Sequence, residues 1–171
     1  EQTKRNRYHD EDFAEYYTYA KKLIQVAHTD DLPVFIIGNG LGATIAARAL
    51  YRNKIECAGF IMVSPWLHLK LEPGKLSKAL SSFSALTSNV KLNHDIKYNT
   101  LTRNFEVYGE MKDETPFNTV VTVKWYRELQ QLLKMLKDPE VKIPTIPVLL
   151  MTGGRDKITD IAASKQWLVQ Q

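Results

Sequence analysis

Apolar residues follow two kinds of pattern along this chain. One repeats at three- and four-residue steps and predicts amphipathic helices, at residues 11–28, 42–52, 123–137 and 160–171. The other is a short, almost continuous apolar run, typical of strands buried on both faces of a sheet, at residues 34–37, 58–63 and 147–152. Strands that alternate with helices predict an α/β fold in which a parallel sheet carries helices on both faces.

Residues 65–122 interrupt this alternation. They are rich in Ser, Asn, Thr and Lys, and short helical patterns occur only around residues 76–86 and 104–112. We therefore predict an inserted subdomain at 65–122 between two segments of the core, 1–64 and 123–171.

The turn after the first predicted strand, "GNGLGA" at residues 38–43, fits two known turns. It matches the G-x-G-x-x-G/A turn of dinucleotide-binding folds at every fixed position. It also matches G-x-S-x-G, the nucleophile turn of α/β-hydrolases, except that Gly40 stands where the serine should be. The turn alone does not separate an oxidoreductase from a hydrolase.

The surrounding sequence favours the nucleophile turn. A dinucleotide site needs an acidic residue at the end of the second strand, about 20 residues further on. Residues 63–66 contain none, and the next acid is Glu72. A hydrolase needs a carboxylate after a later strand, and Asp156 follows the third strand in a glycine-containing loop. The dinucleotide-binding oxidoreductase remains the alternative that an NAD(H) titration tests.

Several stretches resemble the monoglyceride lipase and lysophospholipase group of α/β-hydrolases, which is placed with the serine aminopeptidase-like domains. They are "DLPVFIIGNGLGATIAARAL", "AGFIMVSPWL" and "IPVLLMTGGRDKITD". The resemblance implies an α/β-hydrolase fold with residues 65–122 as its cap or lid. It also implies that early strands and the last strand of that fold are missing from this chain. The implied activity is hydrolysis of small lipid esters by a Ser-Asp-His triad.

The same resemblance assigns roles to particular positions. Position 40 is that of the nucleophile, which is serine in active relatives, and Asp156 is the triad acid. The backbone N–H of Leu41, the residue after the nucleophile position, is an oxyanion donor.

Two parts of that machinery are absent from the sequence. Glycine has no side chain, so no covalent acyl intermediate can form at Gly40. All four histidines of the chain, His9, His28, His68 and His94, precede Asp156, whereas the triad histidine of this fold follows the acid. The chain as written is therefore predicted to be inactive, with a non-catalytic protein that binds a lipid or a partner as the alternative. The sequence leaves open whether Gly40 is a natural loss, an engineered change or the mark of a divergent role.

Three further residues are candidates for a substrate pocket. Trp66 and Leu67 follow the second strand, and Ile158 lies two residues after Asp156. Packing in the core is an equally good explanation for Trp66 and Leu67.

Composition and charge narrow the partners, cofactors and cellular locations that we expect. The net charge of +4 is small and scattered, which argues against a nucleic-acid partner. Cys57 is the single cysteine, so neither an internal disulfide nor a cysteine-rich metal site is expected, and no cofactor is implied.

No apolar run approaches the ~20 residues that a membrane span needs, and we expect a cytoplasmic location. Residue 1 is Glu, and we expect further sequence upstream. The unpaired edges of a three-stranded sheet favour an oligomer or a partner chain that covers them.

Overall fold

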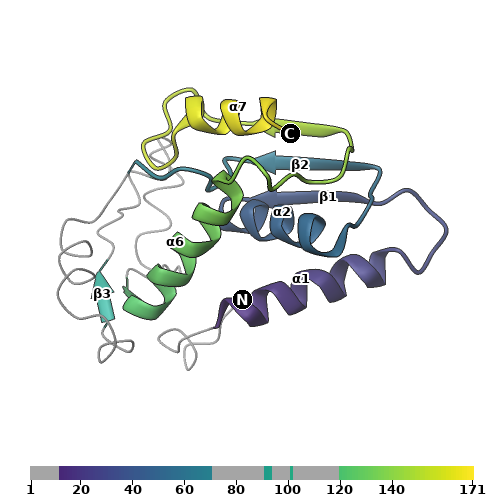
Figure 1. Cartoon of the computed structure of the whole chain (residues 1–171), viewed down its shortest axis with the longest axis horizontal. Coiled ribbons are helices and arrows are strands. Elements are labelled where there is room, and N and C mark those ends of the chain that lie inside the picture. The colour runs from purple at the N-terminus through teal and green to yellow at the C-terminus, as the bar shows by residue number, and fades with distance from the viewer. Residues whose placement is uncertain (1–11, 71–90, 94–100, 102–119) are drawn as a thin grey trace, which may run out of the picture. The chain divides into compact units, whose positions relative to one another are not determined.

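A computed structural model describes residues 12–70, 91–93, 101 and 120–171 (Figure 1). By its internal contacts the chain divides into two units, Asp12–Lys70 with Leu129–Gln171, and Glu1–Glu11 with Leu71–Glu128. The helices are α1 (Phe13–Ala27), α2 (Leu41–Asn53), α6 (Val123–Lys137) and α7 (Ile161–Val169). The strands are β1 (Phe35–Asn39), β2 (Gly59–Val63), β3 (Lys91–Asn93), β4 (Val120–Thr122) and β5 (Val148–Met151).

The larger unit contains a three-stranded parallel sheet in the order β1-β2-β5. Ile37 of β1 lies opposite Ile61 of β2, which in turn lies opposite Leu149 of β5. The predicted parallel α/β arrangement is confirmed. Because the strands run in the same direction, the loops after β1, β2 and β5 all leave from one edge of the sheet.

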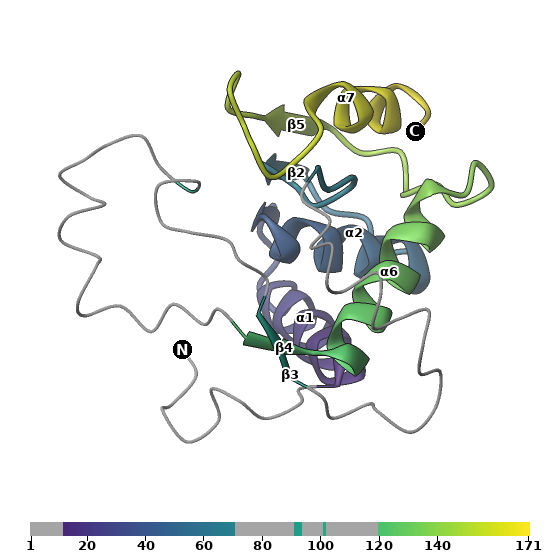
Figure 2. The ribbon, with the colours of Figure 1, turned by 90° about the vertical axis from the view of Figure 1, so that its left-hand side faces the viewer.

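One face of this sheet is open in the described part of the chain. Ile37 and Leu149 are 69% and 54% exposed, and their neighbours Phe35 and Met151 are exposed as well. Helix α2 contacts β1 and β2, and Figure 2 shows α2 and α7 on the same side of the strands. The expectation that β1 and β5 are buried on both faces is therefore wrong here, since no described helix covers the second face. An oligomer or partner on these strands stays a prediction.

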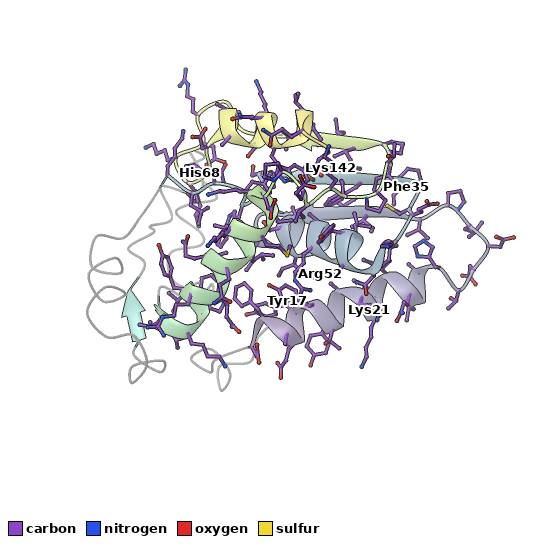
Figure 3. The ribbon with its side chains drawn as sticks, viewed as in Figure 1. Tyr17, Lys21, Phe35, Arg52, His68 and Lys142 are labelled. Atoms are coloured by element: carbon purple, nitrogen blue, oxygen red, sulfur yellow. The ribbon has the colours of Figure 1, made fainter. Side chains whose placement is uncertain are left out.

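Helices α1 and α2 pack against each other. Phe13 and Ile24 of α1 are buried as its spacing predicts, but Leu23 is 73% exposed because it lies on the outer side of the helix. Tyr17 reaches from α1 toward α2 (Figure 3). The guanidinium of Arg48 lies 3.5 Å from the centroid of the Tyr17 ring. This cation–π contact adds a specific pairing to the apolar packing of the two helices.

Helix α7 is tied to the C-terminal part of α6. The indole N–H of Trp167, a buried side chain, donates to the backbone carbonyl of Leu136 at 3.0 Å. Ser164, a polar residue of α7, is fully buried. Its hydroxyl is satisfied locally because it donates to the carbonyl of Asp160 at 3.1 Å.

The smaller unit contains a short antiparallel pair, β3 and β4, with Leu92 opposite Val121. Thr122 begins α6 with a side-chain cap, since its hydroxyl oxygen accepts from the N–H of Trp125 at 3.0 Å. The predicted helices around 76–86 and 104–112 lie outside the described residues. The division into 1–64, 65–122 and 123–171 stays a prediction.

The junction of β1 and α2 depends on a close approach at Gly38. A Cβ atom at this position would lie 2.4 Å from Cα and 2.7 Å from N of Ala43, both backbone atoms of α2. A Cβ atom at Gly42, four residues further on, would meet no other atom within 4 Å. Of the two flanking glycines, only Gly38 is required by space.

These two glycines give a matched test. Gly38→Ala should lower the free energy of unfolding by about 1–3 kcal/mol, because the helix must move away from the strand. Gly42→Ala should leave it unchanged or raise it by up to about 1 kcal/mol, because alanine favours the helix. Urea denaturation of both variants measures the difference, and equal stabilities would contradict the close approach.

Candidate functional site

Gly40 holds the conformation that a nucleophile turn needs. Its φ is 55° and its ψ is −122°, a combination that residues with a side chain rarely adopt. Its N–H donates to the carbonyl of Val63 at 2.9 Å, and its carbonyl accepts from the N–H of Trp66 at 3.2 Å. The turn is thus fixed between the end of β2 and the start of α2.

A side chain at position 40 would point toward Trp66. A Cβ atom built on Gly40 lies 3.3 Å from the indole Nε1 and 3.7 Å from Cδ1. Trp66 is therefore brought to the predicted nucleophile position. Leu67 is instead buried in the core, 3% exposed, so the structure favours its packing role.

Leu41 is the first residue of α2. The first N–H groups of an α-helix have no acceptor within the helix, and the helix dipole makes this end electropositive. The backbone next to Gly40 therefore offers the kind of donor that the predicted oxyanion role requires.

Asp156 lies in the loop after β5 and is partly buried. Its Oδ1 accepts from the N–H groups of Ile158 at 2.8 Å and Thr159 at 3.0 Å, and its Oδ2 accepts from the hydroxyl of Thr159 at 2.5 Å. Burial raises the pKa of the carboxyl, but these hydrogen bonds and the nearby charge of Lys70 outweigh it. The net pKa lies below the ordinary value for aspartate.

Residues 64–70, here called the linking segment, join the two predicted sites. At one end, the N–H of Trp66 bonds Gly40, and the hydroxyl of Thr44 donates to the carbonyl of Trp66 at 2.8 Å. At the other end, the segment pairs with the acid loop. There the N–H of Lys70 donates to the carbonyl of Ile158 at 2.8 Å.

Two more contacts hold the acid loop to the linking segment. The N–H of Asp160 donates to the carbonyl of His68 at 2.9 Å, and the ammonium of Lys70 donates to the carbonyl of Asp156 at 3.0 Å. His68 itself lies on the segment that leaves β2 (Figure 3). Gly40 and Asp156 are therefore attached to one continuous piece of backbone.

The sequence prediction missed Thr159, Lys70 and Thr44. The spacing Asp-x-x-Thr carried a usable signal for Thr159, because an aspartate often accepts from backbone N–H groups two and three residues on. Lys70 and Thr44 reach their partners across the fold, and no local pattern marks such contacts. Ile158 contributes its N–H to Asp156; its predicted pocket role stays a prediction.

The described residues contain no group of three or more His, Cys, Asp or Glu side chains placed to hold a metal ion. Across 12–70, 91–93, 101 and 120–171, no helix has the length and apolar character needed to cross a membrane.

Comparison with known proteins decides the family. A family model described as "Serine aminopeptidase, S33" matches residues 2–171, nearly the whole chain. The chain belongs to this family. Over 167 residues the chain is 29% identical to phospholipase YtpA of Bacillus subtilis (strain 168), an alignment that covers 96% of this chain and 64% of that protein.

Solved structures agree with this S33 assignment at the level of the fold. A monoacylglycerol lipase of Paleococcus ferrophilus matches with a TM-score of 0.64 and 19% identity, over 90% of this chain and 60% of that one. A soluble variant of the monoglyceride lipase of Saccharomyces cerevisiae, solved with a substrate analog, matches with a TM-score of 0.72 and 16% identity. This match covers 92% of this chain and 55% of the yeast enzyme's chain. The α/β-hydrolase resemblance is confirmed, and the chain spans roughly three-fifths of the length of these relatives.

The turn conformation predicts the cost of a side chain at position 40. Gly40→Ala should lower the free energy of unfolding by about 1–3 kcal/mol, because alanine is strained at this positive φ. Its Cβ would also press on Trp66. In a Trp66→Leu background the loss should become smaller but persist, since only the contact with the indole is relieved. Urea denaturation of the four proteins in this cycle measures both parts; a Gly40→Ala variant as stable as the parent would contradict the assigned backbone geometry.

The lowered pKa of Asp156 predicts how stability depends on pH. A carboxyl whose folded pKa lies below its unfolded value stabilises the fold above the unfolded pKa, and this contribution disappears as pH falls through the folded pKa. Asp156→Asn should therefore be less stable than the parent near neutral pH. The difference should shrink as pH falls below the ordinary aspartate pKa of about 4 and then through the lower pKa of the folded state. Thermal unfolding at several pH values tests this, and a difference that grows with acidity would reverse the assigned sign.

Proposed function

We propose that this chain is a lipase-like member of the S33 family that does not carry out the covalent step of ester hydrolysis. Gly40 carries the proposal. It has the backbone geometry of the nucleophile turn, and it has no oxygen or sulfur atom that could attack a carbonyl carbon.

The proposed roles describe what an active relative does at the same positions. A serine at position 40 attacks the ester carbonyl, and a histidine takes its proton. Asp156 holds that histidine in the right orientation, and the N–H of Leu41 stabilises the oxyanion. In this chain the acid and the N–H are present, whereas the attacking group is absent.

The described histidines do not replace the missing base. The ring of His28 caps α1 and faces two backbone carbonyls, with Nδ1 2.8 Å from the oxygen of Ile24 and Nε2 3.2 Å from that of Glu56. His68 is exposed, and among the described residues the carboxylate of Asp156 has its partners in Ile158 and Thr159. His9 and His94 lie outside the described residues.

We take small lipid esters, of the monoacylglycerol or lysophospholipid kind, as the ligand class of this site. The support is the phospholipase and the two monoacylglycerol lipases that the chain resembles. The indole ring of Trp66 suits the apolar chain of such a ligand, and the backbone N–H groups at the start of α2 suit its carbonyl group.

Binding without turnover is the second candidate. The observation that favours it is the geometry of the turn. Gly40 has its unusual φ, and the linking segment joins it to the loop of Asp156, although position 40 carries no nucleophile that would require this arrangement. Lipid extracted from the purified chain and identified by mass spectrometry tests this candidate. A lipid-free protein that also fails to take up a labelled monoacylglycerol would reject it.

Turnover assays test the leading proposal. The chain should hydrolyse neither a nitrophenyl ester nor a monoacylglycerol above the rate without protein. Gly40→Ser in the same chain should stay inactive too, because no histidine follows Asp156. Multiple turnovers by the chain with Gly40 intact would overturn the proposal, whereas turnover only by Gly40→Ser would show that another residue supplies the base.

A further inference from the structure

Asp156 uses most of its hydrogen-bonding capacity inside its own loop. A carboxylate offers about four acceptor sites, two on each oxygen. Oδ1 accepts two backbone N–H groups, and Oδ2 accepts the hydroxyl of Thr159 at 2.5 Å. Among the described residues, one acceptor site is therefore left, and it is on Oδ2.

Thr159 is more deeply buried than the acid it contacts. It is 2% exposed, and it forms an isolated antiparallel bridge with Leu69 of the linking segment. Its backbone N–H and its hydroxyl both point at the same carboxylate. A buried hydroxyl that donates to a charged acceptor makes a short, strong hydrogen bond without competition from water.

We infer that Thr159 is a positioning residue for Asp156: its buried hydroxyl fixes Oδ2, so that the free acceptor site of this oxygen points in one direction. The backbone N–H groups alone would fix Oδ1 and leave the second oxygen less constrained. This inference rests on the proposed function in one respect, because the triad role of Asp156 gives the fixed direction its use. In an active relative, that free site is where an imidazole N–H can bind.

The hydroxyl also stabilises the charged form of the carboxylate, and this gives a measurable signal. Lys70 is the charged side chain that acts on Asp156 from the linking segment, and its ammonium bonds the backbone carbonyl rather than the carboxylate. Burial raises the pKa of Asp156 and its hydrogen bonds lower it, so without the Thr159 hydroxyl fewer hydrogen bonds oppose the effect of burial. The pKa of Asp156 should then rise.

Carbon-13 NMR of the Asp156 carboxyl over a pH titration tests the inference. Thr159→Val should raise the pKa of Asp156, and Thr159→Ser, which keeps the hydroxyl, should hold it at the parent value. Thr44→Val is the matched control. It removes a buried hydroxyl that bonds Trp66, at the other end of the linking segment, and should leave the pKa of Asp156 unchanged.

If Thr159→Val does not fold, the parent protein still decides the question. The side-chain carbon shifts of Thr159 should titrate with the midpoint of Asp156, because the hydrogen bond changes when the carboxylate is protonated. The inference would be overturned if the Thr159 carbon shifts do not change with the protonation of Asp156, or if Thr159→Val leaves the pKa of Asp156 unchanged. Neither result depends on turnover, so the positioning role and the proposed function fail separately.

Discussion

The contact between Gly38 and Ala43 is the constraint on which the rest of the site depends. Because a strand residue here approaches the backbone of α2 more closely than any Cβ permits, the chain turns from strand to helix within a very short distance. That sharp turn places Gly40 at a positive φ and directs the first N–H groups of α2 toward the carboxyl edge of the sheet. A bulkier residue at position 38 would move the helix, and with it every group that the site takes from the turn.

The linking segment extends this constraint to the acid. Residues 64–70 bond Gly40 through Trp66 and then pair with the loop of Asp156, so one short piece of backbone contacts both predicted sites. Position 40 and Asp156 are thus held by the same piece of backbone, and position 40 carries no side chain. Glycine bears less strain at this φ than a serine would.

Sequence patterns were sufficient for the parts of the structure that are set locally. The order of the three parallel strands and the four described helices, the turn at Gly40 and the acid after β5 follow from apolar spacing and glycine positions, whereas the short strands β3 and β4 were missed. Burial was predicted less well. Ile37 and Leu149 have the side chains of buried strands but are exposed, and Ser164 is polar but buried. Periodicity identifies apolar faces, but it cannot say which element covers them. For the same reason it missed Lys70 and Thr44, whose partners are distant in sequence.

The central claim is that the turn at Gly40 has no attacking group. The most direct measurement is the intact mass of the chain after incubation with a fluorophosphonate, which forms a stable covalent adduct with the activated serine of a hydrolase. The account predicts an unchanged mass, equal to that of the untreated protein, under conditions in which an active serine lipase is fully labelled. A stoichiometric adduct, mapped by digestion to any residue beside Gly40, would contradict it.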